Sequence, residues 1–264
     1  MKQLPKILTL IIFSFIFFNL SAQEDNFKDD PVANSSNENK KFRFGLVLNP
    51  NISWLKPNTS GYTKEGSKFG FSYGLSTEFF LAKNYLFSTG LIVNSLGGEI
   101  SYEGVYEDNS GINFPSEVTQ EFNIKYVEIP LTLKLRTNEI GYMTYYGNFG
   151  LKTGIKYKSS SDFTYVDISN SPKLEKINTA SSVFFLNTWL VIGAGAEYRI
   201  SGNTAISLGV SYNNGLINTL DFKTNEIDPV TQKAALDASG NPVLTNKNAS
   251  ANINFFSFDI GIYF

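Results

Sequence analysis

The chain has 264 residues, with 22 basic and 24 acidic side chains, and it contains neither cysteine nor histidine. A formal net charge of −2 gives no basic field that would attract nucleic acid, so no nucleic-acid partner is expected. The two missing residue types exclude disulfides, Cys/His metal sites, thiol nucleophiles and Ser-His hydrolases. We expect no cofactor.

The first 22 residues have the composition of a secretory signal peptide. Lys2 and Lys6 precede an apolar run over 7–18 that is too short to span a bilayer comfortably, and Ala22 ends a small-residue cleavage site. The stretch 23–41 is polar, charged and poor in apolar residues, which predicts a disordered periplasmic tail. The mature chain is therefore expected to be exported.

Residues 42–264 read as one domain of alternating strands. Period-two segments occur at 42–54, 69–81, 85–102, 122–136, 141–157, 183–200, 204–218 and 252–264. Short turns join the second strand to the third, the fourth to the fifth and the sixth to the seventh, whereas the other connections are long: 55–68, 103–121, 158–182 and 219–251. Short turns at one end and long loops at the other are typical of bacterial outer-membrane barrels, whose short turns are periplasmic. The sequence predicts an all-β fold, an eight-stranded antiparallel up-and-down transmembrane β-barrel.

Each strand sets bulky apolar side chains against small or polar ones, as Phe44 and Leu46 alternate with Arg43 and Gly45. Alternation alone leaves two barrels open: a lipocalin-like one with the apolar face inside, and a membrane barrel with that face in lipid. The polar face is rich in Gly, Ser and Asn, which suit the crowded interior of an eight-stranded barrel. Aromatic residues near the strand ends match two interfacial girdles. These features favour a barrel in the bacterial outer membrane.

The same alternation places six cations and four anions in the lumen: Arg43, Glu78, Glu128, Lys134, Arg136, Lys152, Lys156, Glu197, Arg199 and Asp259. Two interpretations are open, a self-neutralising ion-pair network that fills the lumen, and a selective polar pathway or binding pocket. The narrow bore of eight strands favours the network. Pro130 cannot donate a ladder hydrogen bond, so it predicts a bulge or a ladder position served by a lumen group.

No motif in the chain specifies a reaction, and no catalytic residue is expected. No pair of acids has a spacing that specifies glycosidase chemistry. Asp221, Glu226, Asp228 and Asp237 in the last long loop could hold a calcium ion, but they lack the dense alternation of an EF-hand loop. We therefore expect no metal site.

Two segments resemble a known family. YVEIPL at 126–131, with Tyr126, Glu128 and Pro130, and the following Lys134, resembles the "YLEIPLLLK" signature of PorT-like outer-membrane β-barrel proteins of the Bacteroidetes type. Tyr212, Gly215 and Leu216 resemble a Tyr…Gly-Leu segment of the family's later strands. The terminal Phe264 is similar to the aromatic end that the barrel assembly machinery recognises. The resemblance covers most of residues 42–264.

The resemblance implies a non-enzymatic outer-membrane protein with an interaction or assembly role, and its founding kind takes part in a type IX protein secretion pathway. The partners it implies are outer-membrane lipid, the barrel assembly machinery and secretion-complex proteins. Two alternatives stay open. One is a narrow channel or small-solute pathway through the lumen, and the other is an outer-membrane enzyme, which the absent His and Cys disfavour.

Overall fold

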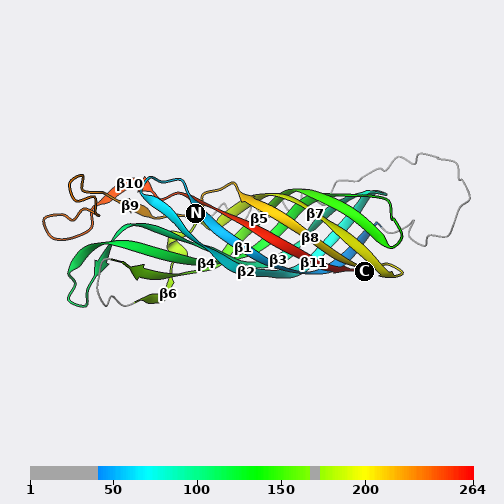
Figure 1. The fold of residues 1–264 in the computed structure, drawn as a ribbon, viewed down its shortest axis with the longest axis horizontal. Coiled ribbons are helices and arrows are strands. Elements are labelled where there is room, and N and C mark those ends of the chain that lie inside the picture. Colours follow the sequence, from blue (N-terminus) through cyan, green and yellow to red (C-terminus); the bar gives the residue numbers. More distant parts are fainter. Residues whose placement is uncertain (1–40, 167–172) are drawn as a thin grey trace, which may run out of the picture. The chain divides into compact units, whose positions relative to one another are not determined.

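The computed structural model describes residues 41–166 and 173–264, so the expected signal peptide (1–22) and nearly all of the expected tail (23–41) lie outside the described residues. One antiparallel sheet closes on itself, in the order β4-β3-β2-β1-β11-β8-β7-β5 with β5 paired to β4 (Figure 1). Its strands are β1 (Phe42–Pro57), β2 (Tyr62–Ala82), β3 (Tyr85–Glu107), β4 (Asn113–Arg136), β5 (Met143–Tyr165), β7 (Leu186–Ser201), β8 (Thr204–Gly215) and β11 (Ala251–Tyr263). The predicted eight-stranded antiparallel up-and-down barrel is confirmed.

Smaller elements gather at the long-loop end. β6 (Leu174–Asn178) pairs with the end of β5, η2 (Ala180–Ser182) is a single 3-10 turn, and β9 (Lys223–Asn225) pairs with β10 (Leu244–Asn248) in a separate two-stranded ribbon. No helix in the described part of the chain is long and apolar enough to cross a membrane.

The strands run further at the long-loop end than the sequence predicts. The connection expected at 103–121 shrinks to residues 108–112, because β3 continues to Glu107 and β4 begins at Asn113. The outward-facing residues of these extensions are mostly polar, so the segments lack the apolar alternation by which the other strands were predicted. Their inner faces carry buried side chains such as Val118 and Gln120, and burial of these keeps the strands paired.

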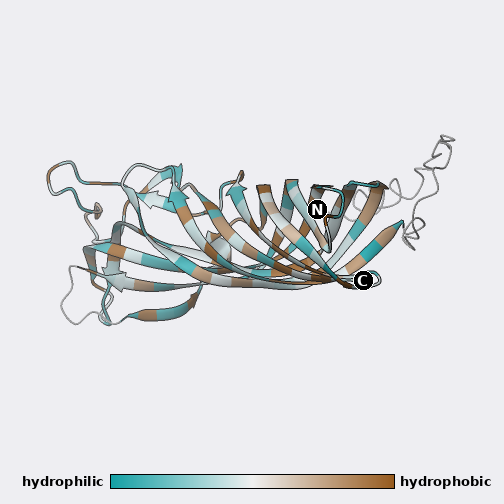
Figure 2. Ribbon diagram, turned by 45° about the vertical axis from the view of Figure 1, so that its right-hand side comes forward, coloured by the Kyte–Doolittle hydropathy of each residue, from teal (hydrophilic) through white to brown (hydrophobic). Residues whose placement is uncertain are grey.

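The outward face of the barrel is apolar. Phe44, Leu75 and Ile192 are 56%, 60% and 59% exposed, whereas the inward-facing Glu128 and Asn187 are fully buried. Hydrophobic residues accordingly recur as brown segments along the strands (Figure 2). A continuous apolar surface of this extent is not stable in water. The lipocalin-like alternative, with its apolar face inside, is excluded.

Pro130 does not mark a bulge, so that half of the expectation was wrong. It pairs with Lys152 of β5 without a register shift. On the other side, β3 and β4 have no paired residues between Ser88–Thr132 and Ile92–Glu128, and the register is the same on both sides of this gap. The missing proline N–H therefore interrupts the ladder locally without displacing it. The register shift of the β4–β5 pair lies closer to the long-loop end, between Lys125 and Tyr126 of β4.

Candidate functional site

A network of four charged side chains crosses the lumen in its short-turn half. Arg43 Nη2 lies 2.5 Å from Glu78 Oε2 and 2.5 Å from Glu197 Oε1, and Lys134 Nζ lies 2.9 Å from Glu78 Oε1 and 2.5 Å from Glu197 Oε1. All four side chains are at most 8% exposed. Two cations and two carboxylates neutralise each other, and this pairing is what makes their burial tolerable.

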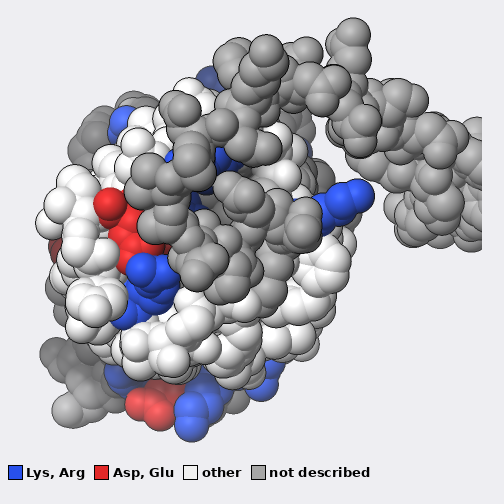
Figure 3. All heavy atoms as spheres, turned by 90° about the vertical axis from the view of Figure 1, so that its right-hand side faces the viewer, with Lys and Arg blue, Asp and Glu red and all other residues white. Residues whose placement is uncertain are grey.

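Aromatic rings fill the bore around this network. The Arg43 guanidinium lies 4.6 Å from the ring centroid of Tyr263, and Lys134 Nζ lies 4.1 Å from that of Tyr146. Such positions give favourable cation–π contacts. Gly45 provides the space, because a Cβ there would lie 2.6 Å from the Tyr263 ring. Seen onto the short-turn end, basic and acidic side chains lie against one another among uncharged ones (Figure 3).

A second buried pair lies further along the lumen. Lys152 Nζ is 3.7 Å from Glu128 Oε2, while Glu128 Oε1 accepts a 2.8 Å hydrogen bond from Asn94. Asn51 in turn donates to Asn94 Oδ1 at 3.0 Å. A polar cavity of about 100 Å³ adjoins both charged groups, with Lys134 and Lys152 among its lining residues. This volume holds about three water molecules.

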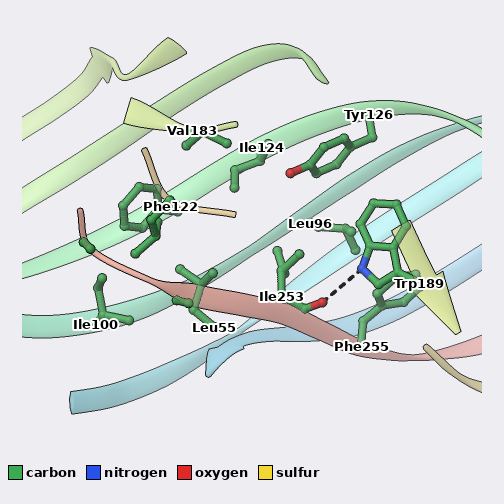
Figure 4. Packing of buried hydrophobic residues seen from close by; sticks show 13 residues of the cluster. Leu55, Leu96, Ile100, Phe122, Ile124, Tyr126, Val183, Trp189, Ile253 and Phe255 are labelled. Atoms are coloured by element: carbon green, nitrogen blue, oxygen red, sulfur yellow. Dashed lines mark hydrogen bonds between the residues drawn. The ribbon is translucent and has the colours of Figure 1, made fainter. Parts of the chain in front are cut away.

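An apolar cluster closes the lumen at the long-loop end (Figure 4). Trp189 is its largest side chain, and its Nε1 donates a 3.0 Å hydrogen bond to the carbonyl oxygen of Ile253. Tyr126 meets the Trp189 ring edge-on, with centroids 5.3 Å apart. The cluster comprises Leu55, Leu96, Ile100, Phe122, Ile124, Tyr126, Val183, Trp189, Leu220, Ala249, Ala251, Ile253 and Phe255.

Sequence reasoning missed this apolar cluster, since it assigned the whole inward face to small and polar residues. A signal was present. Leu55, Phe122, Trp189 and Phe255 all stand at inward positions of the alternation, and all lie towards the long-loop ends of their strands. Loop residues such as Leu220 complete the closure, and no periodicity marks them.

The structure does not bring all ten expected lumen charges together. Arg136 reaches the network, 3.7 Å from Glu197 Oε2, and Asp259 lines the cavity and accepts a hydrogen bond from Ser257. Arg199 instead pairs with Glu139 in a short turn, at 2.6 Å. Lys156 donates to the carbonyl oxygens of the 180–183 segment. Arg199 stands near the short-turn end of β7, and Lys156 lies opposite Tyr126 of the apolar cluster, away from the four-residue network. Their inclusion in one network was therefore wrong.

The motif residues Tyr212 and Gly215 have local structural reasons. Tyr212 faces outward, and its ring centroid lies 6.4 Å from that of Trp54 in a stacked arrangement. Gly215 backs onto β11, where a Cβ would lie 3.2 Å from the carbonyl carbon of Ile253. The same carbonyl group accepts the Trp189 hydrogen bond, so a larger residue at 215 would disturb the apolar cluster.

Leu216 and Phe264, the other two residues noted for the family resemblance, form backbone hydrogen bonds at the ends of their strands. The Leu216 N–H donates to the carbonyl of Thr188 at 2.8 Å, and its side chain is half exposed. Phe264 donates its N–H to the carbonyl of Phe44 at 2.8 Å and leaves its ring exposed at the short-turn end.

The acids of the last loop close turns. Within residues 41–166 and 173–264, no group of three or more His, Cys, Asp or Glu side chains is placed to hold a metal ion. Asp237 Oδ1 accepts the backbone N–H groups of Asn241 and Ser239 at 2.9 and 2.8 Å. These hydrogen bonds, that from Asn241 first, hold the pKa of Asp237 below its ordinary value.

A closed eight-stranded barrel with an apolar exterior and a polar, charged interior is the architecture of outer-membrane proteins. A family model described as "Outer membrane protein beta-barrel domain" matches residues 22–264. The chain belongs to this family. It is a β-barrel of the bacterial outer membrane. In such barrels the short turns face the periplasm and the long loops face the cell exterior.

Solved structures of other outer-membrane proteins are similar at low identity. Neisserial surface protein A is 9% identical, with a TM-score of 0.40 over 85% of this chain and 96% of that one. Ail, the attachment invasion locus protein of Yersinia pestis, is 14% identical, with a TM-score of 0.33 over 85% and 100%. The outer membrane protease OmpT from Escherichia coli is 11% identical, with a TM-score of 0.38 over 84% and 96%. No curated protein matches the sequence.

Proposed function

We propose that this barrel is a non-conducting, non-enzymatic interaction component of the outer membrane. Two observations support this proposal. The lumen is filled at two levels, by the Arg43–Glu78–Lys134–Glu197 network and by the apolar cluster. At the long-loop end, strands β3 and β4 continue well beyond the part of the barrel whose outer face is apolar. A closed lumen disfavours transport through the barrel. A tall ordered extension favours a role in contacts.

The extended β3–β4 hairpin at the long-loop end is held in place by hydrogen bonds to the last loop. From Val127 to the start of β4 at Asn113 runs about 45 Å of strand. The β9–β10 ribbon and the loop between its strands support the β3–β4 hairpin. Asn225 Nδ2 of β9 donates to the carbonyl of Glu103, and Asn113 Nδ2 donates to the carbonyl of Gly240 in that loop, each at 3.0 Å. Preorganised surfaces lose less entropy on binding a partner than flexible loops do.

The resemblance of YVEIPL and the Tyr212–Leu216 segment to PorT-like proteins supports a finer proposal, a part in a type IX-like protein secretion pathway. Its partners would be secretion-complex proteins, together with outer-membrane lipid and the barrel assembly machinery, which would recognise Phe264. The alternative, a narrow channel or small-solute pathway, has only the cavity of about 100 Å³ in its favour. An enzyme would need a catalytic group other than His or Cys, because the chain has neither.

The test of the secretion role compares the secreted proteome of a deletion strain with that of its parent. Loss of exported adhesins and proteases from the surface and medium, with their accumulation in the periplasm, supports it. Complementation with the Gly147→Ala variant, which alters an uncrowded strand position, serves as the control for expression. Unchanged export overturns the secretion role.

A further inference from the structure

Lysines gather just above the lipid-facing band on the extracellular side. On β4 the outward residues Leu131, Ile129 and Val127 are followed, two positions higher, by Lys125. On β5 the exposed Ile155 and Tyr157 are followed by Lys158. One step of two residues is about 7 Å of strand, so these ammonium groups stand at the level of the polar head groups.

A β-bulge brings the two lysines onto the same face. Lys125 pairs with Lys158, whereas its neighbour Tyr126 pairs with Lys156, so Tyr157 is the extra residue of β5. Below the bulge odd-numbered residues of β5 face outward, and above it even-numbered residues do. Without the extra residue Lys158 would point to the inner face, as Ser159 does.

Lys125 and Lys158 are therefore directly opposed like charges, an arrangement that is destabilising unless an anion lies between them. Among the described residues, neither lysine has an ion pair. The next outward pair up the sheet is the uncharged Asn123–Ser160, and the acids of the Glu121–Asp162 pair begin only above it. Glu121 stands about 13 Å along the strand from Lys125, and it already pairs with Lys68.

Strands further round the barrel carry exposed lysines next to an aromatic residue as well. Lys64 of β2 lies over the Trp54 ring, 5.1 Å from its centroid, and Lys56 of β1 is exposed two residues above Trp54. An aromatic belt with lysines directly above it is the arrangement expected where apolar chains give way to anionic head groups.

We propose that Lys125 and Lys158 form a binding site for the phosphate groups of a phosphorylated lipid in the outer leaflet. The acyl chains lie along Val127, Ile129 and Ile155, and the phosphate lies between the two ammonium groups. This site is separate from the lumen and from the secretion role, since it depends only on the barrel's place in the membrane.

The test is native mass spectrometry of the detergent-solubilised barrel titrated with lipid A, a diphosphorylated, acylated disaccharide. We expect the wild type to retain lipid A, and the variant Lys125→Gln/Lys158→Gln to retain it about tenfold less well. The control Lys41→Gln/Lys83→Gln removes two exposed lysines at the short-turn end and should behave as wild type. Heat-modifiable gel mobility verifies that each variant is folded.

Two further probes decide the source of the phosphate. Dephosphorylated lipid A retained as tightly as lipid A would mean that only the apolar surface binds, and would overturn the proposal. Equal retention of lipid A by the Lys125→Gln/Lys158→Gln variant would overturn it too. Competition by millimolar inorganic phosphate alone would identify a free-anion site instead of a lipid site.

Discussion

Glu78 and Glu197 stand on opposite walls of the barrel and share the same two cations, Arg43 and Lys134. In the ring of strands β2 and β7 are four positions apart, so these ion pairs tie the two walls together across the lumen. Each carboxylate lies between two cations. Removal of either one therefore leaves positive charge buried without compensation.

The substitution Glu197→Gln should destabilise the barrel by about 3–5 kcal/mol, because it breaks a buried pair and leaves its cation partners uncompensated. The measurement is the urea midpoint of unfolding, followed by heat-modifiable gel mobility in micelles. Arg199→Gln is the matched control, since among the described residues this partly exposed rim cation has its ion pair with Glu139 and should contribute about 1 kcal/mol or less. Equal effects of both substitutions would contradict a buried network.

The two tryptophans should report opposite surroundings. Trp54 belongs to the outward aromatic belt, whereas Trp189 is fully buried in the apolar cluster. In bilayers of brominated lipid, Trp189→Phe, which leaves Trp54 as the only tryptophan, should show strong quenching. Trp54→Phe should resist both brominated lipid and aqueous acrylamide. Strong acrylamide quenching of Trp54→Phe would show that water reaches the apolar cluster.

Gly215→Ala should cost about 1–3 kcal/mol of stability, because its Cβ would press on the β11 backbone at Ile253. Urea unfolding measures the loss. Gly147→Ala is the control, since the nearest atom to its Cβ, the carbonyl oxygen of Gly193, is 3.8 Å away. If Gly147→Ala were the more destabilising of the two, the proposed close approach at Gly215 would be wrong.

The turn at Asp237 should persist in mild acid. Its pKa is lowered in the folded loop, so the stabilisation is fully present above the ordinary carboxyl pKa and is lost only as the pH falls through the lowered value. Whole cells treated with an acid-active protease at pH 4 should therefore keep this loop intact. Asp237→Ala should be cut there at pH 4 by the same protease, and at pH 7 by a protease that is active at neutral pH.

Ser239→Ala is the control for the Asp237 experiment, because Ser239 bonds to Asp237 through its backbone N–H and the substitution keeps that donor. Cleavage of Ser239→Ala as fast as Asp237→Ala would show that the Asp237 carboxylate does not hold the turn.

The barrel could be predicted from the sequence because lipid demands a strict alternation. Phe44 and Leu46 face lipid and Arg43 faces the lumen, and a shift by one residue would reverse every side chain. The lengths of the connections predicted the topology, since strands joined by a short turn pair with each other as an antiparallel hairpin. The separation of Lys156 from the network was not predictable, because alternation gives a face but no height or partner.

The parts that escaped prediction depend on tertiary packing. The bulge at Tyr157 has no local signature in the sequence, yet it decides that Lys158 faces outward. The strand extensions persist because their inner-facing Val118 and Gln120 are buried, and Gln120 accepts a hydrogen bond from Tyr102, whose ring contacts the distant loop residue Phe222. Single-strand patterns contain no information on such contacts.

Planar-bilayer conductance of the purified barrel tests the closed lumen most directly. With the lumen occupied by the charge network and the apolar cluster, we predict no stepwise ionic current in concentrated KCl, although heat-modifiable mobility shows that the inserted protein is folded. Reproducible, ohmic open levels from the wild-type protein would contradict the account and favour the channel.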